Sequence, residues 1–157
     1  MTRKGTSRLA AAGMVAAVLI LSACSGGDVS TKAESDVNAA IQQYAEAMAS
    51  TAGAVLENPK FQGGPCSDPT GRDSDTVYSV QGVFNLPPPA SGTHLAVIDR
   101  IRTDWKANGY TITDDRTVGA DNAVLAAETP DGYKLDIENA SPDGFAVIIN
   151  SPCYGRP

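Results

Sequence analysis

Two similar turns near the C-terminus constrain the fold of this chain more than any other feature. Thr129-Pro130-Asp131-Gly132 and Ser141-Pro142-Asp143-Gly144 each place Pro early and Gly late, the order that suits type I turns in hairpins. The segments around them are typical of strands: Ala123–Glu128 and Phe145–Ile149 are apolar, and Tyr133–Glu138 alternates apolar with charged residues. The two turns therefore predict an antiparallel meander.

A helix is predicted before the sheet. Thr31-Lys32-Ala33-Glu34 has the spacing of a capping box, so we expect a helix to begin there. Apolar residues then recur at steps of four and three along the chain, at Val37, Ile41, Tyr44, Met48, Ala52 and Val55. This periodicity is typical of a helix that packs one face against a core.

A second helix is predicted after the triple proline Pro87–Pro89. Ser91 or Thr93 can cap it, Arg100 and Asp104 lie four residues apart on its exposed side, and Gly109 ends it. Its apolar face consists of Leu95, Ile98, Ile101 and Trp105.

The segment between the two predicted helices divides into a loop and a strand. Glu57–Asp75 is rich in Pro and Gly, and we expect an irregular loop there. Asp68, Asp73 and Asp75 within it carry the oxygen ligands that Ca²⁺ uses, but EF-hand spacing is missing, so a solvated acidic loop is favoured over a metal site. Val77–Leu86 alternates and predicts a half-buried strand.

The order of elements is therefore helix, strand, helix and four strands, the first of these four being Tyr110–Val118. We predict an α+β fold in which two helices pack on one face of a mostly antiparallel sheet of about five strands, as a two-layer sandwich. Cys66 lies in the predicted loop and Cys153 follows the last strand. If these two cysteines form a disulfide, Val77–Leu86 and Phe145–Ile149 are expected to be neighbours.

The N-terminus has the features of a secretory signal peptide. Met1–Arg8 is basic, and Leu9–Leu21 is apolar apart from Gly13, which is too short a run for a membrane span. We therefore predict a signal peptide over residues 1–23, a flexible tether over 24–30 and a single extracytoplasmic domain over 31–157.

Leu21-Ser22-Ala23-Cys24 resembles the lipobox of bacterial lipoproteins. The resemblance implies that the Cys24 thiol receives a diacylglyceryl group and holds the protein on the extracytoplasmic face of the cell membrane. Two long acyl chains suffice for stable anchoring. The alternative is ordinary cleavage nearby, which would leave Cys24 as a free thiol.

The cysteine count is odd, which is unusual for a secreted chain. If Cys24 carries lipid, Cys66 and Cys153 can form a disulfide in an oxidising compartment. A reactive or metal-binding pair would need nearby His residues or CxxC spacing. A structural disulfide is therefore expected.

The remaining composition supports no catalytic, metal or cofactor site. The chain carries 12 Lys and Arg against 18 Asp and Glu, which argues against a nucleic-acid groove. His94 is the single histidine, expected to be an exposed residue at a helix start, and no Gly-x-Ser-x-Gly elbow, Walker loop or dinucleotide fingerprint accompanies it. Asp114 and Asp115 are adjacent, so on a strand they would point to opposite faces and would not form an acid–base pair.

The layout of the mature chain resembles small actinobacterial lipoproteins of the LppA-like kind. The stretches that carry this resemblance are Asn108-Gly109-Tyr110, Asp131-Gly132-Tyr133-Lys134-Leu135 and Ile149-Asn150-Ser151-Pro152-Cys153. The resemblance implies a location and a fold, and of the functional residues it implies only Cys24.

Three functions are consistent with these features. The first is a membrane-tethered, non-enzymatic module that binds an envelope protein or other envelope partner through the sheet face or the loop around Cys66. The alternative is a carrier of a small hydrophobic or lipid ligand. The third, least supported, is a hydrolase that uses His94 with an aspartate as acid and base.

Overall fold

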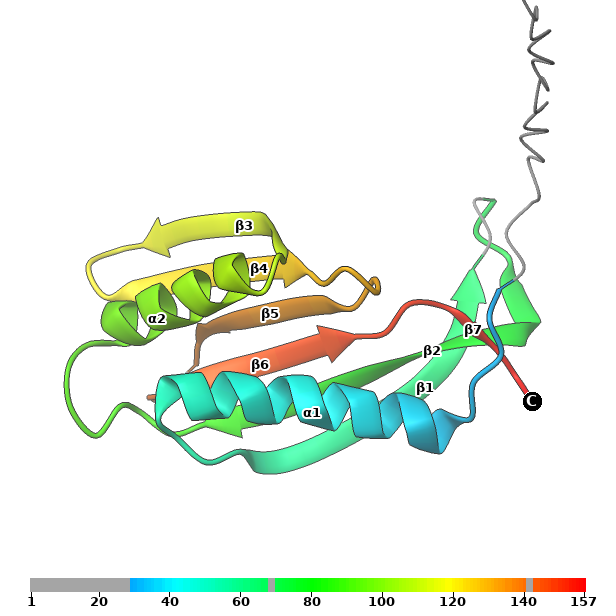
Figure 1. Ribbon diagram of the computed structural model, residues 1–157, viewed down its shortest axis with the longest axis horizontal. Helices are drawn as coiled ribbons and strands as arrows, with labels where there is room; N and C mark the ends of the chain where they lie inside the picture. Colours follow the sequence, from blue (N-terminus) through cyan, green and yellow to red (C-terminus); the bar gives the residue numbers. More distant parts are fainter. Residues whose placement is uncertain (1–28, 68–69, 141–142) are drawn as a thin grey trace, which may run out of the picture.

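The computed structural model describes residues 29–67, 70–140 and 143–157. The predicted signal peptide, Cys24 with most of the predicted tether, Asp68, Ser141 and Pro142 lie outside these residues. Two helices and seven strands form the described domain (Figure 1). The helices are α1 (Glu34–Ala52) and α2 (His94–Ala107). The strands are β1 (Glu57–Ser67), β2 (Asp73–Leu86), β3 (Thr111–Val118), β4 (Asn122–Glu128), β5 (Lys134–Asn139), β6 (Phe145–Asn150) and β7 (Tyr154–Gly155).

All the strand pairs are antiparallel, and the sheet has the order β1-β2-β6-β5-β4-β3, with the short β7 beside β2. The predicted meander is confirmed, because β4, β5 and β6 are consecutive neighbours. The predicted pairing of Val77–Leu86 with Phe145–Ile149 is confirmed as β2 against β6. The α+β class is confirmed as well, with seven strands in place of about five.

The predicted loop over Glu57–Asp75 is wrong. Glu57–Ser67 forms strand β1, and β2 already begins at Asp73. The side chains of β1 are almost all exposed, so the strand has no apolar alternation that sequence reading could detect. Pro59 and Pro65 are tolerated because β1 is an edge strand, where a missing N–H removes no hydrogen bond to an outer neighbour.

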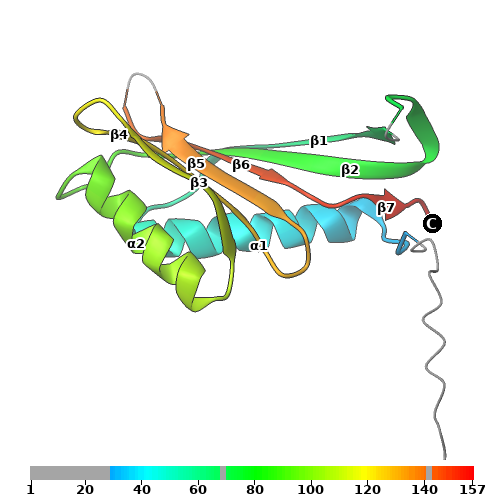
Figure 2. The ribbon, with the colours of Figure 1, turned by 90° about the horizontal axis from the view of Figure 1, so that it is seen from above.

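Both helices lie on the same side of the sheet (Figure 2). The apolar stripe of α1 is confirmed at Val37, Ile41 and Met48, which are buried against the sheet. Val55 is the exception: α1 ends at Ala52 with Gly53 in the left-handed conformation, and Val55 is 76% exposed. The predicted capping box is also wrong. The N-cap is Ala33, without a side-chain hydrogen bond, and Thr31 instead bridges to Gly155.

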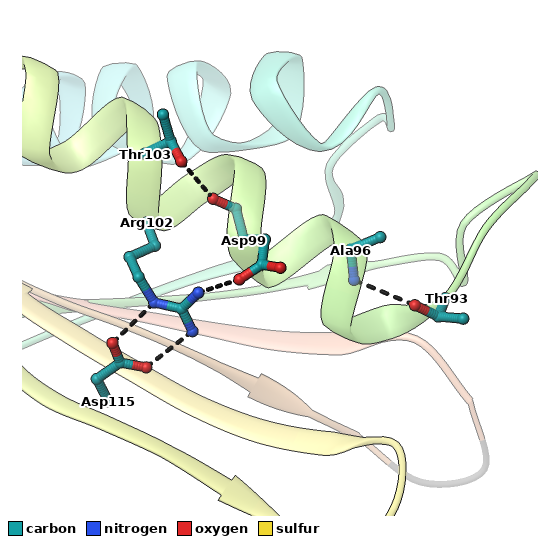
Figure 3. A network of polar contacts seen from close by, with 6 residues as sticks. All are labelled: Thr93, Ala96, Asp99, Arg102, Thr103 and Asp115. Carbon is teal, nitrogen blue, oxygen red and sulfur yellow. Dashed lines mark hydrogen bonds and ion pairs between the residues drawn. The ribbon is translucent and has the colours of Figure 1, made fainter.

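Of the two residues predicted to cap the start of α2, Ser91 and Thr93, the structure has Thr93 as the cap. The Thr93 hydroxyl accepts a hydrogen bond from the Ala96 N–H at 3.2 Å (Figure 3). Farther along the helix, Arg102 contacts Asp99 and forms an ion pair with Asp115 of β3, with Nε 2.7 Å from Oδ2. This contact ties α2 to the far edge of the sheet.

The C-terminal segment holds the two ends of the described chain together. Cys66 and Cys153 form a disulfide, as predicted. Beside it, the Lys32 N–H donates to the Gly155 carbonyl at 3.2 Å, and the Gly155 N–H donates to the Ser30 carbonyl at 3.0 Å. The segment that leads into α1, from Ser30 to Lys32, is therefore fixed next to β7. Among the described residues, no helix is long and apolar enough to cross a membrane.

The close approach of α1 to the sheet depends on a residue without a side chain. A Cβ added to Gly82 of β2 would lie 2.3 Å from Ile41 Cγ2 and 3.0 Å from Phe84 Cε2. Such a contact cannot be relieved without moving α1 or the Phe84 ring. By contrast, a Cβ added to Gly64 on the neighbouring strand β1 would meet nothing within 4 Å.

We therefore predict opposite outcomes for two Gly→Ala substitutions. Gly82→Ala should lower the free energy of unfolding by about 1–3 kcal/mol because it overpacks the α1 interface. Gly64→Ala should leave it unchanged or raise it by up to about 1 kcal/mol, since alanine restricts the unfolded chain. Urea unfolding of the two variants measures the difference. Equal unfolding midpoints would contradict the proposed tight contact.

Candidate functional site: the open face of the sheet

The face of the sheet that points away from the helices is the candidate site, and we call it the open face. Within the described part of the chain, no helix covers it (Figure 2). Because side chains alternate along a strand, each residue next to a buried core position points to this face. The registers align one residue from each of six strands in a lateral row, the central row, which consists of Lys60, Val83, Ile148, Asp136, Ala126 and Asp114.

The central row combines apolar and acidic side chains. Val83, Ile148 and Ala126 are half-buried although no second layer covers them. One flanking row is polar, and in it the Gln81 side-chain amide donates to Asn150 Oδ1 at 3.0 Å. Such a partly apolar, uncovered sheet surface is a common form of contact surface.

A hollow of about 370 Å³ lies on the open face. Ala126 is its smallest open-face side chain, and Glu128, Lys134, Asp136 and Asn150 surround it with longer ones. The hollow exists because alanine occupies a central-row position between long side chains. It therefore offers a small apolar base with charged walls of both signs.

Asp136 is the titratable group at the centre of this face. Burial of its carboxyl raises the pKa of Asp136, and the nearby charges of Glu138 and Asp114 raise it further, while Arg116 opposes them. Arg116 is itself 3.3 Å from Asp114, measured from Nε to Oδ2. The open face thus holds an acidic centre that is only partly neutralised.

The structure places the other predicted candidates elsewhere. Asp114 points to the open face and Asp115 to Arg102 on the helix side, so these two carboxylates do not form a pair, as predicted. Asp73 accepts a hydrogen bond from the Ser67 hydroxyl at 2.7 Å, and the described residues contain no group of His, Cys, Asp and Glu that could hold a metal.

His94 is less exposed than predicted. It is the first residue of α2, its Nε2 lies 2.9 Å from Asp143 Oδ1, and its ring packs edge-on against Phe145 with centroids 5.0 Å apart. These contacts join the start of α2 to the beginning of β6. The imidazole thus has a packing role in the fold.

A network of tyrosines on the helix side was not predicted from the sequence. Asp131 of the first turn accepts hydrogen bonds from the Thr129 hydroxyl at 2.6 Å and the Tyr44 hydroxyl at 2.7 Å. Burial alone would raise the pKa of Asp131. These two hydrogen bonds, a hydrogen bond to its own backbone and the charge of Lys32 together outweigh burial, and the pKa is lowered. Thr129 also accepts from the Tyr133 N–H at 2.9 Å, which fixes the turn.

The same network reaches the start of the described chain. Lys32 Nζ donates to the Tyr154 hydroxyl at 3.2 Å and lies 4.6 Å from the centre of the Tyr154 ring. The Tyr154 hydroxyl in turn donates to the Tyr133 hydroxyl at 3.3 Å. The only signal for this network in the sequence is the tyrosine content, since its members lie far apart along the chain.

No protein-family model, curated protein or solved structure matches this chain. The candidate site therefore stands on geometry and chemistry alone.

The raised pKa of Asp136 predicts how stability depends on pH. A carboxyl that is harder to ionise in the folded state stabilises the fold while it is protonated, and this contribution is lost as pH rises through its folded pKa. Asp136→Asn should therefore raise the melting temperature at pH 7 and have little effect well below the ordinary carboxyl pKa. Asp121→Asn, in the exposed turn between β3 and β4, removes the same charge as a control. An equal rise in both variants would mean that net charge alone is responsible.

Proposed function

We propose that this protein is a non-enzymatic interaction module, tethered to the extracytoplasmic face of a bacterial membrane, that binds an envelope partner through the open face. The observation that carries this proposal is the uncovered central row, in which Val83 and Ile148 lie beside Asp136 and Ala126. Apolar surface left uncovered in this way gains free energy when a partner buries it.

Charge indicates what kind of partner suits this face. The open-face positions of the central row and its flanks hold Asp114, Glu128, Asp136 and Glu138, against Arg116, Lys134 and Lys60. The acidic excess favours a partner whose contact surface is basic around an apolar centre. The short side chains of Ala126 and Ala146 would let such a surface approach the sheet closely.

The proposed location rests on two features. The disulfide between Cys66 and Cys153 is typical of an oxidising, extracytoplasmic compartment. The lipid anchor is proposed from the lipobox-like residues that end at Cys24. Since Ser30 and Lys32 are hydrogen-bonded to Gly155 of β7, the proposed tether would join the domain at that end. The LppA-like relationship remains a proposal of the same kind.

A carrier of a small hydrophobic or lipid ligand is the second candidate function. The observation in its favour is an apolar hollow of about 250 Å³ at the end of the domain where α1 finishes and α2 begins. Its wall includes the three prolines Pro87–Pro89 with Val55 and Phe145. The volume lies just below the usual lower limit of ligand pockets, about 300 Å³, so only a small apolar group would fit.

A hydrolase is the weakest candidate. His94 lies beside Asp143, but the ring also packs on Phe145, and both contacts are explained by the docking of α2. We therefore propose no catalytic residue and no cofactor.

Binding through the open face is tested by filling the hollow. Ala126→Arg should remove most of the partner recovered with the full-length chain after crosslinking in intact cells, because the long cationic side chain occupies the hollow and opposes a basic partner. Ala39→Arg, on the exposed side of α1, introduces the same side chain away from the open face and should keep it. Thermal unfolding establishes that both variants fold. Equal recovery with both variants, or recovery of nothing beyond the background, would exclude the open face as the binding surface.

Mass spectrometry of the full chain extracted from membranes tests the lipid anchor on Cys24, the disulfide between Cys66 and Cys153, and the proposal of a carrier. We expect the mass of a chain that begins at Cys24 with an added diacylglyceryl group, and a gain of two hydrogen atoms after reduction. An unmodified Cys24 would exclude the anchor. Under native conditions, a bound apolar molecule that is lost in Val55→Trp would favour the carrier over the interaction module, because Val55 is an exposed residue of the apolar hollow.

A further inference from the structure

A groove on the helix side of the domain has the features of a separate ligand site. It lies between α1 and α2, which both cover the same face of the sheet (Figure 2), and its volume is about 300 Å³. Met48, Trp105 and Leu135 form an apolar floor, and each of them is almost fully buried. A pocket with an apolar base of this size is suited to a small organic molecule.

Aromatic rings form one end of the groove. The ring centres of Tyr44 and Tyr110 are 6.4 Å apart in an edge-to-face arrangement, and Tyr110 lies the same distance from Trp105. The Tyr44 hydroxyl donates to Asp131, which fixes the ring and increases its electron density. The negative faces of such rings attract cations.

The polar side chains around the groove reinforce this preference. Ser50, Thr51, Asp104 and Asn108 line it, and no Lys, Arg or His is among its lining residues. Asp104 is half-buried, and its carboxylate forms no ion pair within the described ranges of the chain. Burial is the largest cause of the raised pKa of Tyr110, and the negative charge of Asp104 is the second. The carboxylate therefore acts on the aromatic end of the groove.

The neighbouring cation is already engaged. Arg100 lies one turn before Asp104 on α2, but its guanidinium donates to the Thr51 and Ala52 carbonyls at 3.3 and 3.1 Å. It caps the C-terminal end of α1, where the helix dipole favours positive charge. Asp104 therefore remains available to a ligand.

We propose that this groove binds a small organic cation, an ammonium or quaternary ammonium group with an apolar body. The cationic head would lie between the Tyr44 and Tyr110 rings and the Asp104 carboxylate, and the apolar body would cover Met48 and Leu135. A neutral ligand would remove water from Asp104 without compensating its charge, and an anion would be repelled by it. The groove is on the opposite side of the sheet from the open face, so this site is independent of the proposed function.

Trp105 is the only tryptophan of the chain, so its fluorescence reports on this groove specifically. The full-length protein in non-ionic detergent is titrated with choline chloride, which replaces sodium chloride at constant ionic strength. We expect a saturable change in Trp105 emission. The uncharged analogue 3,3-dimethyl-1-butanol, which has the same shape, should produce no saturable change.

Variants test the assignment of the residues. Asp104→Asn preserves the shape of the side chain and removes its charge. We expect it to weaken choline binding about tenfold, the effect of losing one charge-assisted contact. Tyr110→Leu should weaken binding by a similar factor because the ring is lost. Asp121→Asn, in the β3–β4 turn, removes an equal charge away from the groove and should bind as the unchanged protein does.

Three results would overturn the proposal. The absence of a saturable change with choline would mean that the groove takes no such cation. Equal binding of the neutral analogue would mean that the groove is only an apolar site. Unchanged affinity in Asp104→Asn, with Tyr110→Leu also unchanged, would place the binding elsewhere on the protein.

Discussion

The pairing of β2 with β6 is the contact on which the rest of the domain depends. It aligns six residue pairs, from Gln81 with Asn150 to Leu86 with Phe145, and it joins the N-terminal hairpin to the C-terminal meander. Ser151 extends the contact, since its hydroxyl accepts from the Val80 N–H at 2.9 Å. A pairing between such distant segments costs loop-closure entropy, and the disulfide between Cys66 and Cys153 removes part of that cost by restricting the unfolded chain.

The two helices make the two faces of the sheet different, because both pack on the same face (Figure 2). Gly82 lets α1 lie close to β2, and Arg102 ties α2 to Asp115 on β3, so both helices cover one face. The covered face holds the core and the aromatic groove. The opposite face keeps Val83 and Ile148 beside the acidic centre at Asp136. The proposed macromolecular contact and the proposed small-cation site thus belong to opposite sides of one sheet.

Much of this architecture is readable along the chain because it is local. The Pro-Asp-Gly turns predict the meander, and the stripe through Val37 and Ile41 predicts α1. Strand β1 could not be predicted from the sequence, because an exposed edge strand has no apolar alternation and its prolines suggest a loop. Arg100 and Asp104 were expected to be an exposed pair four residues apart. The structure instead directs Arg100 to the end of α1 and leaves Asp104 in the groove, because α1 packs beside α2.

The sequence by itself determined the class of the fold, the pairing of β2 with β6, the meander of β4, β5 and β6, and the partnership of Cys66 with Cys153. Periodicity, turn chemistry and cysteine count act over short stretches or by simple arithmetic. It also carries the prediction that Cys24 anchors the protein. Only the tertiary structure decided which surfaces stay uncovered and which side chains meet there. Asp136, Ala126 and Asp114 come from three different strands, and Tyr44, Asp104 and Tyr110 from three separate segments. Their proximity results from strand register and helix packing, which no single stretch of the chain encodes.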